Sequence, residues 1–243
     1  MHGFAYDSIH DEIVVTSPLA QAVLSFRGDA DGEEPPLRVI QGPHTQIDGP
    51  PNLGNDRVSI DPVHDEIYVP AVPASVLVFD RKASGDAAPK RVLSGPETQF
   101  QAPGIRGMVT VAVDPVHNLL VVNHDNSLLI FDRTANGDAK PLRVIKGPKS
   151  GLATISSFQI YAPKGWIVAA GQGGFIGVWS VNDNGDVPPR WKIPVEQLTG
   201  YVASGIALDP AHKEMMLSCA GQRVRPRSGI ANAVLTFSWP EIF

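Results

Sequence analysis

The sequence predicts an all-β chain that folds as a β-propeller of about five blades, each of four antiparallel strands. Three observations predict this fold class: a motif recurs along the whole chain about every 50 residues, each copy holds four short runs of strand-forming residues, and helical periodicity is nearly absent. We therefore expect one domain, residues 1–243, with blades at about 4–57, 58–107, 108–155, 156–201 and 202–243.

The clearest repeat is a turn of the form Asp-Pro-x-His, at residues 61–64, 114–117 and 209–212, with a shorter relative at 7–10. A degenerate copy is expected at 162–165, with Gly165 in the place of the histidine. Glycine accepts a positive φ freely and histidine tolerates it better than most residues. We therefore interpret the position as a structural turn rather than a ring of metal-binding imidazoles, and we expect the aspartate to cap the turn through its side chain.

The third expected strand of each copy is the most regular and closes with an aromatic residue, which suits packing between neighbouring sheets. These residues are Phe26, Phe79, Phe131, Trp179 and Phe237. In copies two to four a Gly-Asp turn follows the third strand and leads to a fourth strand. In copies one to three the fourth strand begins directly after a proline or one residue later, and it carries an arginine. We expect both residues to protect an outer edge, with the arginine pointing outward.

The fifth copy differs from the others because only residues 240–243 follow its third strand. A last blade of three strands is therefore expected. Pro240 lies just beyond the third strand and would blunt its exposed edge. We expect a closed monomer in which the first and fifth blades are joined by packing.

The Asp-Pro-x-His and Gly-Asp-x-x-Pro turns together resemble those of NHL repeats, and more closely those of a bacterial NHL-like branch without an assigned function. The resemblance covers the entire chain and implies a propeller. Its motifs specify blades and not chemistry. The WD dipeptide that marks the WD40 class does not occur in the sequence.

Composition narrows the function classes. The net charge of −5 offers no basic field to attract nucleic acid. The single cysteine, Cys219, excludes an internal disulfide framework. No apolar run approaches the roughly 20 residues that span a bilayer, so no membrane insertion is expected. The start, residues 1–4, lacks the pattern of a signal peptide, which predicts a cytoplasmic protein unless the chain is the mature form of a periplasmic or secreted one.

A binding face is expected where the loops that return to the next blade meet the loops between strands two and three. These loops differ among the copies, as binding loops do on a fixed scaffold. The last of them, residues 222–228, holds three arginines, and arginine binds carboxylate and phosphate bidentately. The alternative is a solvated loop that keeps an uncovered edge soluble. The predicted ligand-facing residues are Arg57, Arg106, His124, Tyr201, Arg223, Arg225 and Arg227.

Two functions from different classes remain. The first is a non-enzymatic binding module, without a cofactor, whose loop face and channel mouth hold a small anionic molecule, a glycan or a protein. The second is a metal-dependent hydrolase, lactonase or lyase with Ca or Zn at the channel mouth, for which His124 and Asp125 are weak candidate ligands. The loops carry mostly Arg, Asn, Gln and Ser, a set that favours binding over catalysis.

Overall fold

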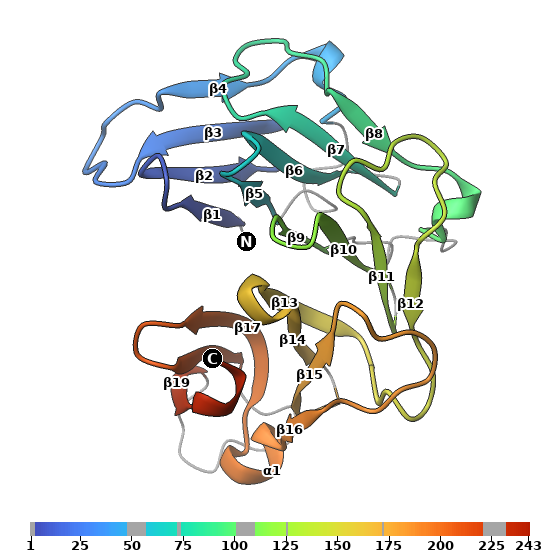
Figure 1. Cartoon of the computed structure of the whole chain (residues 1–243). Helices are drawn as coiled ribbons and strands as arrows, with labels where there is room; N and C mark the ends of the chain where they lie inside the picture. Colours follow the sequence, from blue (N-terminus) through green and yellow to red (C-terminus); the bar gives the residue numbers. More distant parts are fainter. Residues whose placement is uncertain are drawn as a thin grey trace. The chain divides into compact units, whose positions relative to one another are not determined.

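The repeat predicted from the sequence is built as five antiparallel sheets in a computed structural model, which describes residues 3–47, 57–71, 74–100, 110–124, 126–171, 173–220 and 232–243. Four sheets have four strands, and the fifth has three in the described residues. These sheets are the blades of a β-propeller, so the predicted fold class and the three-stranded last blade are confirmed (Figure 1). The closure of the first blade on the fifth stays a prediction, as does the interpretation of the chain as one domain.

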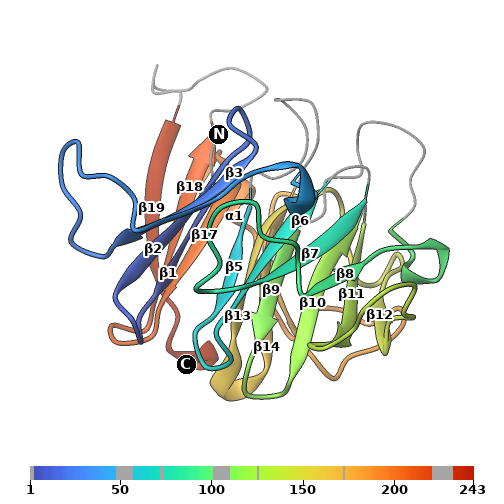
Figure 2. The same ribbon diagram turned by 90° about the horizontal axis from the view of Figure 1, so that it is seen from above.

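The chain forms two compact units, and the first comprises Met1–His124 and Leu129–Leu142. In its first two sheets the strands follow one another in chain order (Figure 2). Buried aliphatic residues such as Val14, Val23, Ile67 and Leu77 form one core cluster. The strands of the first three sheets are β1 (Phe4–Asp7), β2 (Glu12–Ser17), β3 (Ala22–Arg27), β4 (Arg38–Ile40); β5 (Ser59–Asp61), β6 (Glu66–Ala71), β7 (Ser75–Asp80), β8 (Arg91–Leu93); and β9 (Thr110–Asp114), β10 (Leu119–His124), β11 (Ser127–Asp132), β12 (Arg143–Ile145). The short helices η1 (Pro43–Thr45) and η2 (Pro96–Thr98) follow the first two sheets.

The second unit comprises Asp125–Leu128 and Arg143–Phe243. Besides β12 and the start of β11, its strands are β13 (Ile155–Tyr161), β14 (Trp166–Gly171), β15 (Ile176–Ser180), β16 (Trp191–Ile193); and β17 (Val202–Asp209), β18 (Glu214–Ala220), β19 (Asn232–Ser238). The helical segments are η3 (Ala162–Lys164), α1 (Val195–Thr199) and η4 (Pro240–Ile242). Among the described residues, no helix has the length and apolarity needed to traverse a bilayer.

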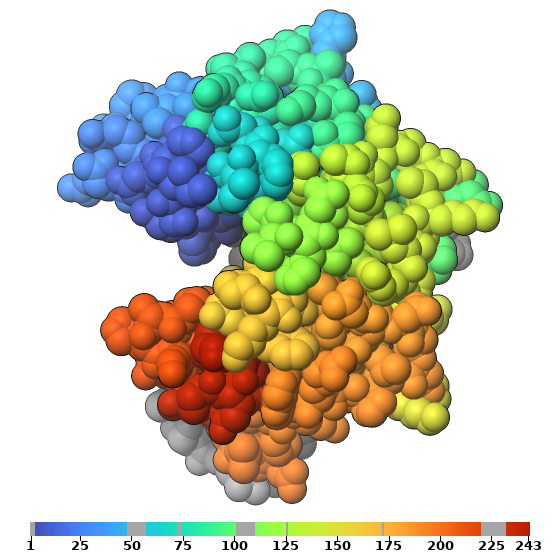
Figure 3. Space-filling view, in the orientation of Figure 1, coloured from blue at the N-terminus to red at the C-terminus, as the bar shows by residue number. Residues whose placement is uncertain are grey.

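An apolar core joins the fourth and fifth sheets inside the second unit. Val168 and Val178 of the fourth sheet share a buried cluster with Leu217 and Trp239 of the fifth. The C-terminal residues close one end of this core: Phe243 packs edge-to-face on Tyr161 with ring centroids 5.1 Å apart, and its carbonyl oxygen accepts a hydrogen bond of 2.7 Å from Lys164 Nζ. Figure 3 shows the C-terminal residues in dark red beside the yellow segment of the fourth sheet.

The aspartate of each Asp-Pro-x-His turn caps the turn as predicted. Asp61 Oδ1 accepts hydrogen bonds of 3.1 Å from the backbone N–H groups of Val63 and His64. Its other oxygen, Oδ2, lies 2.8 Å from His64 Nδ1. The same contacts recur in the turns at residues 7–10, 114–117 and 209–212. The histidine therefore stiffens the turn that its aspartate begins.

The positive φ expected at the histidine lies one residue later. Gly165, with φ 62°, shares this place with the non-glycine residues, so the degenerate copy begins at Tyr161 and not at Ala162. Lys164 then occupies the place of the histidine. The prediction was wrong by one residue because the left-handed residue ends the turn. Its carbonyl oxygen accepts a hydrogen bond from the backbone N–H of the residue that follows the third strand of the same sheet, as Gly165 does from Val181 at 2.9 Å. The equivalent residues are Asp11 (53°), Asp65 (55°), Asn118 (56°) and Lys213 (57°).

The Gly-Asp turns of the second, third and fourth sheets each bind the sheet that precedes them in the chain. Gly85 pairs in parallel with Ile40, and Asp86 Oδ1 accepts a hydrogen bond of 2.7 Å from the backbone of His44 in the preceding connector. Gly42 lies so close that an added Cβ would stand 2.4 Å from Asp86 Oδ1, and its φ is 141°. The connector glycine and the turn aspartate therefore require one another. The same pairing recurs at Gly95 with Asp138 and at Gly147 with Asp186.

Two of the three fourth-strand arginines, Arg38 and Arg91, do not point outward, which corrects the prediction for them. Arg91 donates hydrogen bonds of 2.8 and 2.7 Å to the two oxygens of Glu66, at the start of β6, and Arg38 donates to one oxygen of Glu12. Glu66 is only 4% exposed. A buried carboxylate requires a charged partner, so the arginine turns inward to the glutamate of its own sheet.

Candidate binding site

In the first unit, the charged side chains fasten neighbouring sheets. Arg133 Nη1 donates a 2.6 Å hydrogen bond to Glu66 of the preceding sheet, and Arg133 Nε donates 2.9 Å to Asn118 Oδ1 of its own. Arg81 likewise donates 2.9 Å to Glu12 and 2.6 Å to Asp65. Both guanidinium groups are buried. These charged side chains therefore hold neighbouring sheets together.

Glu66 is the most strongly perturbed acid of this network. Burial acts to raise the pKa of Glu66, but the hydrogen bonds from Arg91 and Tyr68 and the charges of Arg91 and Arg133 outweigh it, and the pKa falls from 4.5 to about 2. Burial, and then the hydrogen bond to Glu66, raise the pKa of Tyr68. Glu66 is thus held ionised and is unsuited to proton transfer near neutral pH.

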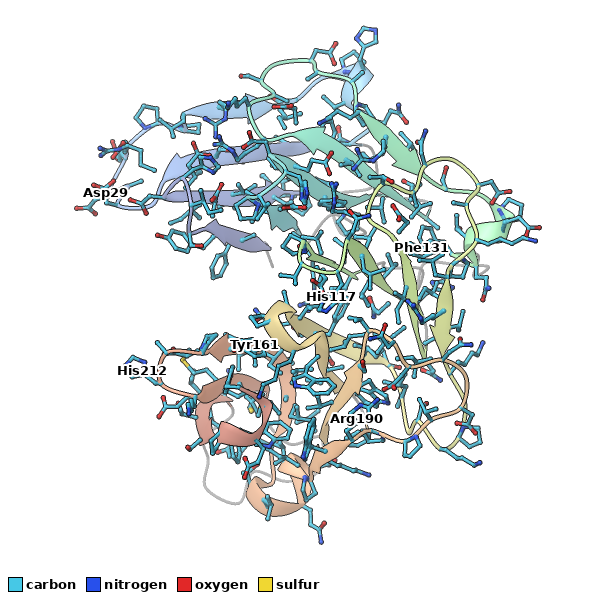
Figure 4. The ribbon with its side chains drawn as sticks, in the orientation of Figure 1. Asp29, His117, Phe131, Tyr161, Arg190 and His212 are labelled. Atoms are coloured by element: carbon cyan, nitrogen blue, oxygen red, sulfur yellow. The ribbon has the colours of Figure 1, made fainter. Side chains whose placement is uncertain are left out.

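The turn histidines are engaged in the same structural manner. His117 and His212 lie on two of these turns in Figure 4, each with Nδ1 against its aspartate. The hydrogen bond with Asp209 raises the pKa of His212. Neighbouring turns of the first unit approach one another, since His10 Nε2 is 3.8 Å from Asp65 Oδ1. In the described residues, however, no three His, Cys, Asp or Glu side chains gather as metal ligands would.

Three of the residues predicted to face a ligand lie in the described part of the chain. His124 ends β10 and is 5% exposed. Arg57 is half-buried, two residues before β5. Tyr201 is half-buried and packs against the apolar core of the second unit. Their role in binding stays a prediction. The other residues of that set, Arg106, Arg223, Arg225 and Arg227, lie outside the described residues, as does Asp125, the second candidate metal ligand.

A hollow does open on the predicted loop face, in the fourth sheet. It lies between the connector that returns to β13 and the loop between β14 and β15, and it is shallow: its empty space of about 210 Å³ includes open solvent. We call it the loop-face hollow; its lining residues are Gly151, Leu152, Ala153, Ile155, Ala169, Ala170, Gly171, Gly173, Phe175 and Trp179. Its lining side chains are all apolar, and backbone groups supply the polar part of the surface.

Glycines give the loop-face hollow its shape. An added Cβ on Gly171 would lie 2.6 Å from the carbonyl oxygen of Thr154, and one on Gly173 would lie 2.9 Å from the Phe175 ring. The run 171–174 leads into β15 and not into a helix, so it is not a phosphate-binding loop. The glycines instead let the connector and the aromatic ring approach the end of β14 closely.

Aromatic rings line one side of the hollow, with charges near it. The Phe175 and Trp179 rings have centroids 6.5 Å apart at a tilt of 46°, and Trp179 is 1% exposed. Lys192 Nζ, on β16, lies 4.0 Å from the Phe175 ring centroid, a cation–π contact. The backbone N–H of Glu196 donates 2.9 Å to the carbonyl oxygen of Gly174. An apolar pocket beside one basic and one acidic side chain is suited to holding an apolar group.

The sequence reasoning missed Phe175 and Lys192. The sequence indicated Trp179 only as the aromatic residue that closes a third strand. A usable signal was present: Gly171, Gly173 and Gly174 directly precede Phe175. A run of small residues beside an aromatic ring leaves space around that ring and can expose apolar surface.

Comparison with known proteins supports the fold. No family model matches the chain, and no curated protein matches it. Solved structures match widely: 1033 chains do so, which is typical of an architecture used by many families. One is a propeller chain in the crystal structure of a mitotic checkpoint complex, with a TM-score of 0.58 and 11% sequence identity.

That match covers 89% of this chain and 59% of the other, so this chain spans about three-fifths of its length. At 11% identity the likeness shows the fold alone. The fold and the hollow together define a β-propeller with an apolar recess on the loop face of its fourth sheet.

Proposed function

We propose that this chain is a non-enzymatic binding module that recognises a protein partner through the loop-face hollow. The observation that carries the proposal is the hollow itself. The rings of Phe175 and Trp179 line one side of it, and glycines line another. It lies where a propeller of this repeat was expected to bind.

The size of the hollow favours a protein partner over a free small molecule. Sites for drug-sized ligands are cavities of roughly 300–1,000 Å³, whereas a water-sized sphere can enter only about 10 Å³ of this hollow. Such a shallow recess would receive the end of one apolar side chain and would not enclose a free ligand. Protein interfaces concentrate their affinity in a few anchor side chains that fill pockets of this kind.

The charges around the hollow would set the orientation of the partner. Lys192 and Glu196 are both exposed and lie on β16 and α1, next to the hollow. Exposed charges at the edge of an interface act mainly on association rate and specificity, and the apolar anchor supplies affinity. A segment with one aliphatic or aromatic residue flanked by polar residues suits this arrangement.

The placement of the ionisable groups supports binding over the hydrolase alternative. In the first unit, Glu12, Glu66, Arg81 and Arg133 form the joints between sheets, and the turn histidines are held by their aspartates. Groups held in structural ion pairs are poorly suited to general acid–base work. The propeller match from the checkpoint complex is itself a chain in an assembly, which agrees with a binding role.

A peptide selection tests the proposal. A displayed library of random peptides is selected on the purified full chain, and the peptides are then measured against Ala153→Arg, which fills the hollow from its half-buried edge. We expect peptides that share one aliphatic or aromatic anchor and that lose on the order of tenfold or more in affinity for this variant, because a buried anchor contributes about 2 kcal/mol.

Ala88→Arg is the matched control, since it adds the same charge at an exposed alanine of the second sheet. The selected peptides should bind Ala88→Arg as they bind the unaltered chain. Peptides that bind both variants equally, or a selection that yields no anchor, would contradict the proposal.

A further inference from the structure

The third strand of the fifth sheet is covered far less than its counterparts. The side chains of β15 are buried throughout, and those of β7 are buried from Ser75 to Phe79. Along β19, half-buried and exposed side chains alternate, and Val234 is 76% exposed. The alternation means that one face of the fifth sheet is uncovered, because successive side chains of a strand point to opposite faces, and Met216 on the neighbouring strand β18 is 38% exposed as well. The edge of the sheet also differs: β19 is the outermost described strand of its sheet, whereas β7 and β15 each have a fourth strand beside them.

The other sheets show which strand fits beside a third strand. In the second sheet Arg91, Val92 and Leu93 pair antiparallel with Val78, Leu77 and Val76. In the first sheet Arg38, Val39 and Ile40 pair with Ser25, Leu24 and Val23 in the same register. The pattern is one basic residue followed by two aliphatic residues. In the fifth sheet the corresponding third-strand positions are Val234, Leu235 and Thr236.

Glu214 supplies the second half of the pattern. It pairs with Ser238 at the start of the second strand, as Glu12 pairs with Arg27 and Glu66 pairs with Asp80. Glu12 and Glu66 each bind the arginine of their own fourth strand. Within the described residues, Glu214 has no lysine or arginine within ion-pair distance.

We propose that the fifth sheet binds an extended segment of a partner polypeptide as its fourth strand, with a basic residue on Glu214 and two aliphatic residues beside Leu235 and Val234. The backbone of β19 would supply the hydrogen bonds, as an exposed sheet edge does when a peptide adds a strand. This surface is separate from the loop-face hollow, and the proposal goes beyond the function proposed above.

Charge complementarity selects this occupant over a second copy of β19. The strand Asn232–Ser238 contains no basic residue. Two copies paired edge to edge would join their backbones but would bring no cation to either Glu214. A strand with an arginine or lysine at its start would supply backbone hydrogen bonds to the edge of β19 and a cation to the carboxylate of Glu214.

The test uses this chain's own fourth strand as the probe. An acetylated and amidated peptide of residues 89–94, Pro-Lys-Arg-Val-Leu-Ser, carries a fluorescent label, and its binding to the full chain is followed by anisotropy. We expect saturable binding. Replacing its arginine by glutamate should weaken binding by about tenfold or more, because the charge-assisted bond is lost. Methylating the amide nitrogen of the lysine should also weaken it, because in the second sheet Lys90 N donates 2.7 Å to the carbonyl oxygen of Val78.

Charge exchange makes the test decisive. Glu214→Arg should reject the arginine peptide and accept the glutamate peptide, while Glu241→Gln, which removes an exposed carboxylate beyond β19, should change neither. Ala153→Arg should leave this binding unchanged, so failure of the hollow and failure of the edge can be told apart. Absence of peptide binding, unaltered binding to Glu214→Gln, or self-association of the chain through β19 would overturn the proposal.

Discussion

Arg133 of the third sheet and Glu66 of the second are joined by a 2.6 Å hydrogen bond between two buried side chains. The same carboxylate also accepts from Arg91 and Tyr68. One glutamate therefore connects the fourth strand of its own sheet with the neighbouring sheet. Removing either charge of a buried pair leaves the other without compensation, which is costly.

Acid should weaken the first unit through Glu66. Its pKa lies near 2 in the folded chain against 4.5 when free, so its ionised form contributes stability that is fully present above pH 4.5 and is lost as the pH falls toward 2. This contribution amounts to about 3 kcal/mol. Urea unfolding at pH 7 and pH 3 should therefore show a marked difference between the unaltered chain and Glu66→Gln at pH 7 that shrinks at pH 3. A difference independent of pH would contradict this role.

Gly95→Ala should destabilise the chain by about 2 kcal/mol or more, because it combines a positive φ with a clash. Gly95 has φ 130°, and an added Cβ would lie 2.4 Å from Asp138 Oδ1. Gly137 has φ 61° and nothing within 4 Å of an added Cβ, so Gly137→Asn serves as the control. We expect the control to cost less than half as much in thermal or urea unfolding. Equal losses would show that the contact with Asp138 is unimportant.

The pKa of His212 should lie above 6.5 and should fall when its aspartate is neutralised. The hydrogen bond with Asp209 raises it, and the charge of Asp209 adds to the effect. A two-dimensional NMR titration of the imidazole protons measures this pKa in the unaltered chain and in Asp209→Asn. No change between the two would mean that the turn does not hold the ring in solution.

Metal removal should leave the chain unchanged if binding is its function. We expect metal analysis of the purified chain to find no stoichiometric Ca, Zn or Mn, and dialysis against EDTA to leave the melting temperature as it was. Ligands that bind only the folded chain raise its stability, so loss of a resident metal would lower it. A stoichiometric metal would instead favour the hydrolase, lactonase or lyase alternative.

The blades could be predicted because their signals are local. Asp61 and His64 are three residues apart, and such a turn is readable from a short stretch of sequence. Even there the degenerate copy was misplaced by one residue, since Tyr161 bears no likeness to aspartate and only the φ of Gly165 fixes the alignment.

The inward arginines and the hollow could not be predicted, because they depend on contacts between distant residues. Arg91 turns toward Glu66, 25 positions away, and nothing near Arg91 in the sequence shows that this glutamate is buried. Gly171 must be small because Thr154 approaches it from another loop. The missing partner of Glu214 could have been predicted in principle. Glu12 and Glu66 each bind an arginine of the fourth strand, and the described part of the fifth sheet has no fourth strand to supply one.

Hydrogen–deuterium exchange with a selected peptide bound tests the proposed binding role most directly. Backbone amides that are shielded by a partner exchange more slowly, and the footprint locates the interface. The account predicts slower exchange in residues 151–155 and 169–175, which form the loop-face hollow, with little change in the first unit. Protection elsewhere, with these two segments unchanged, would contradict it.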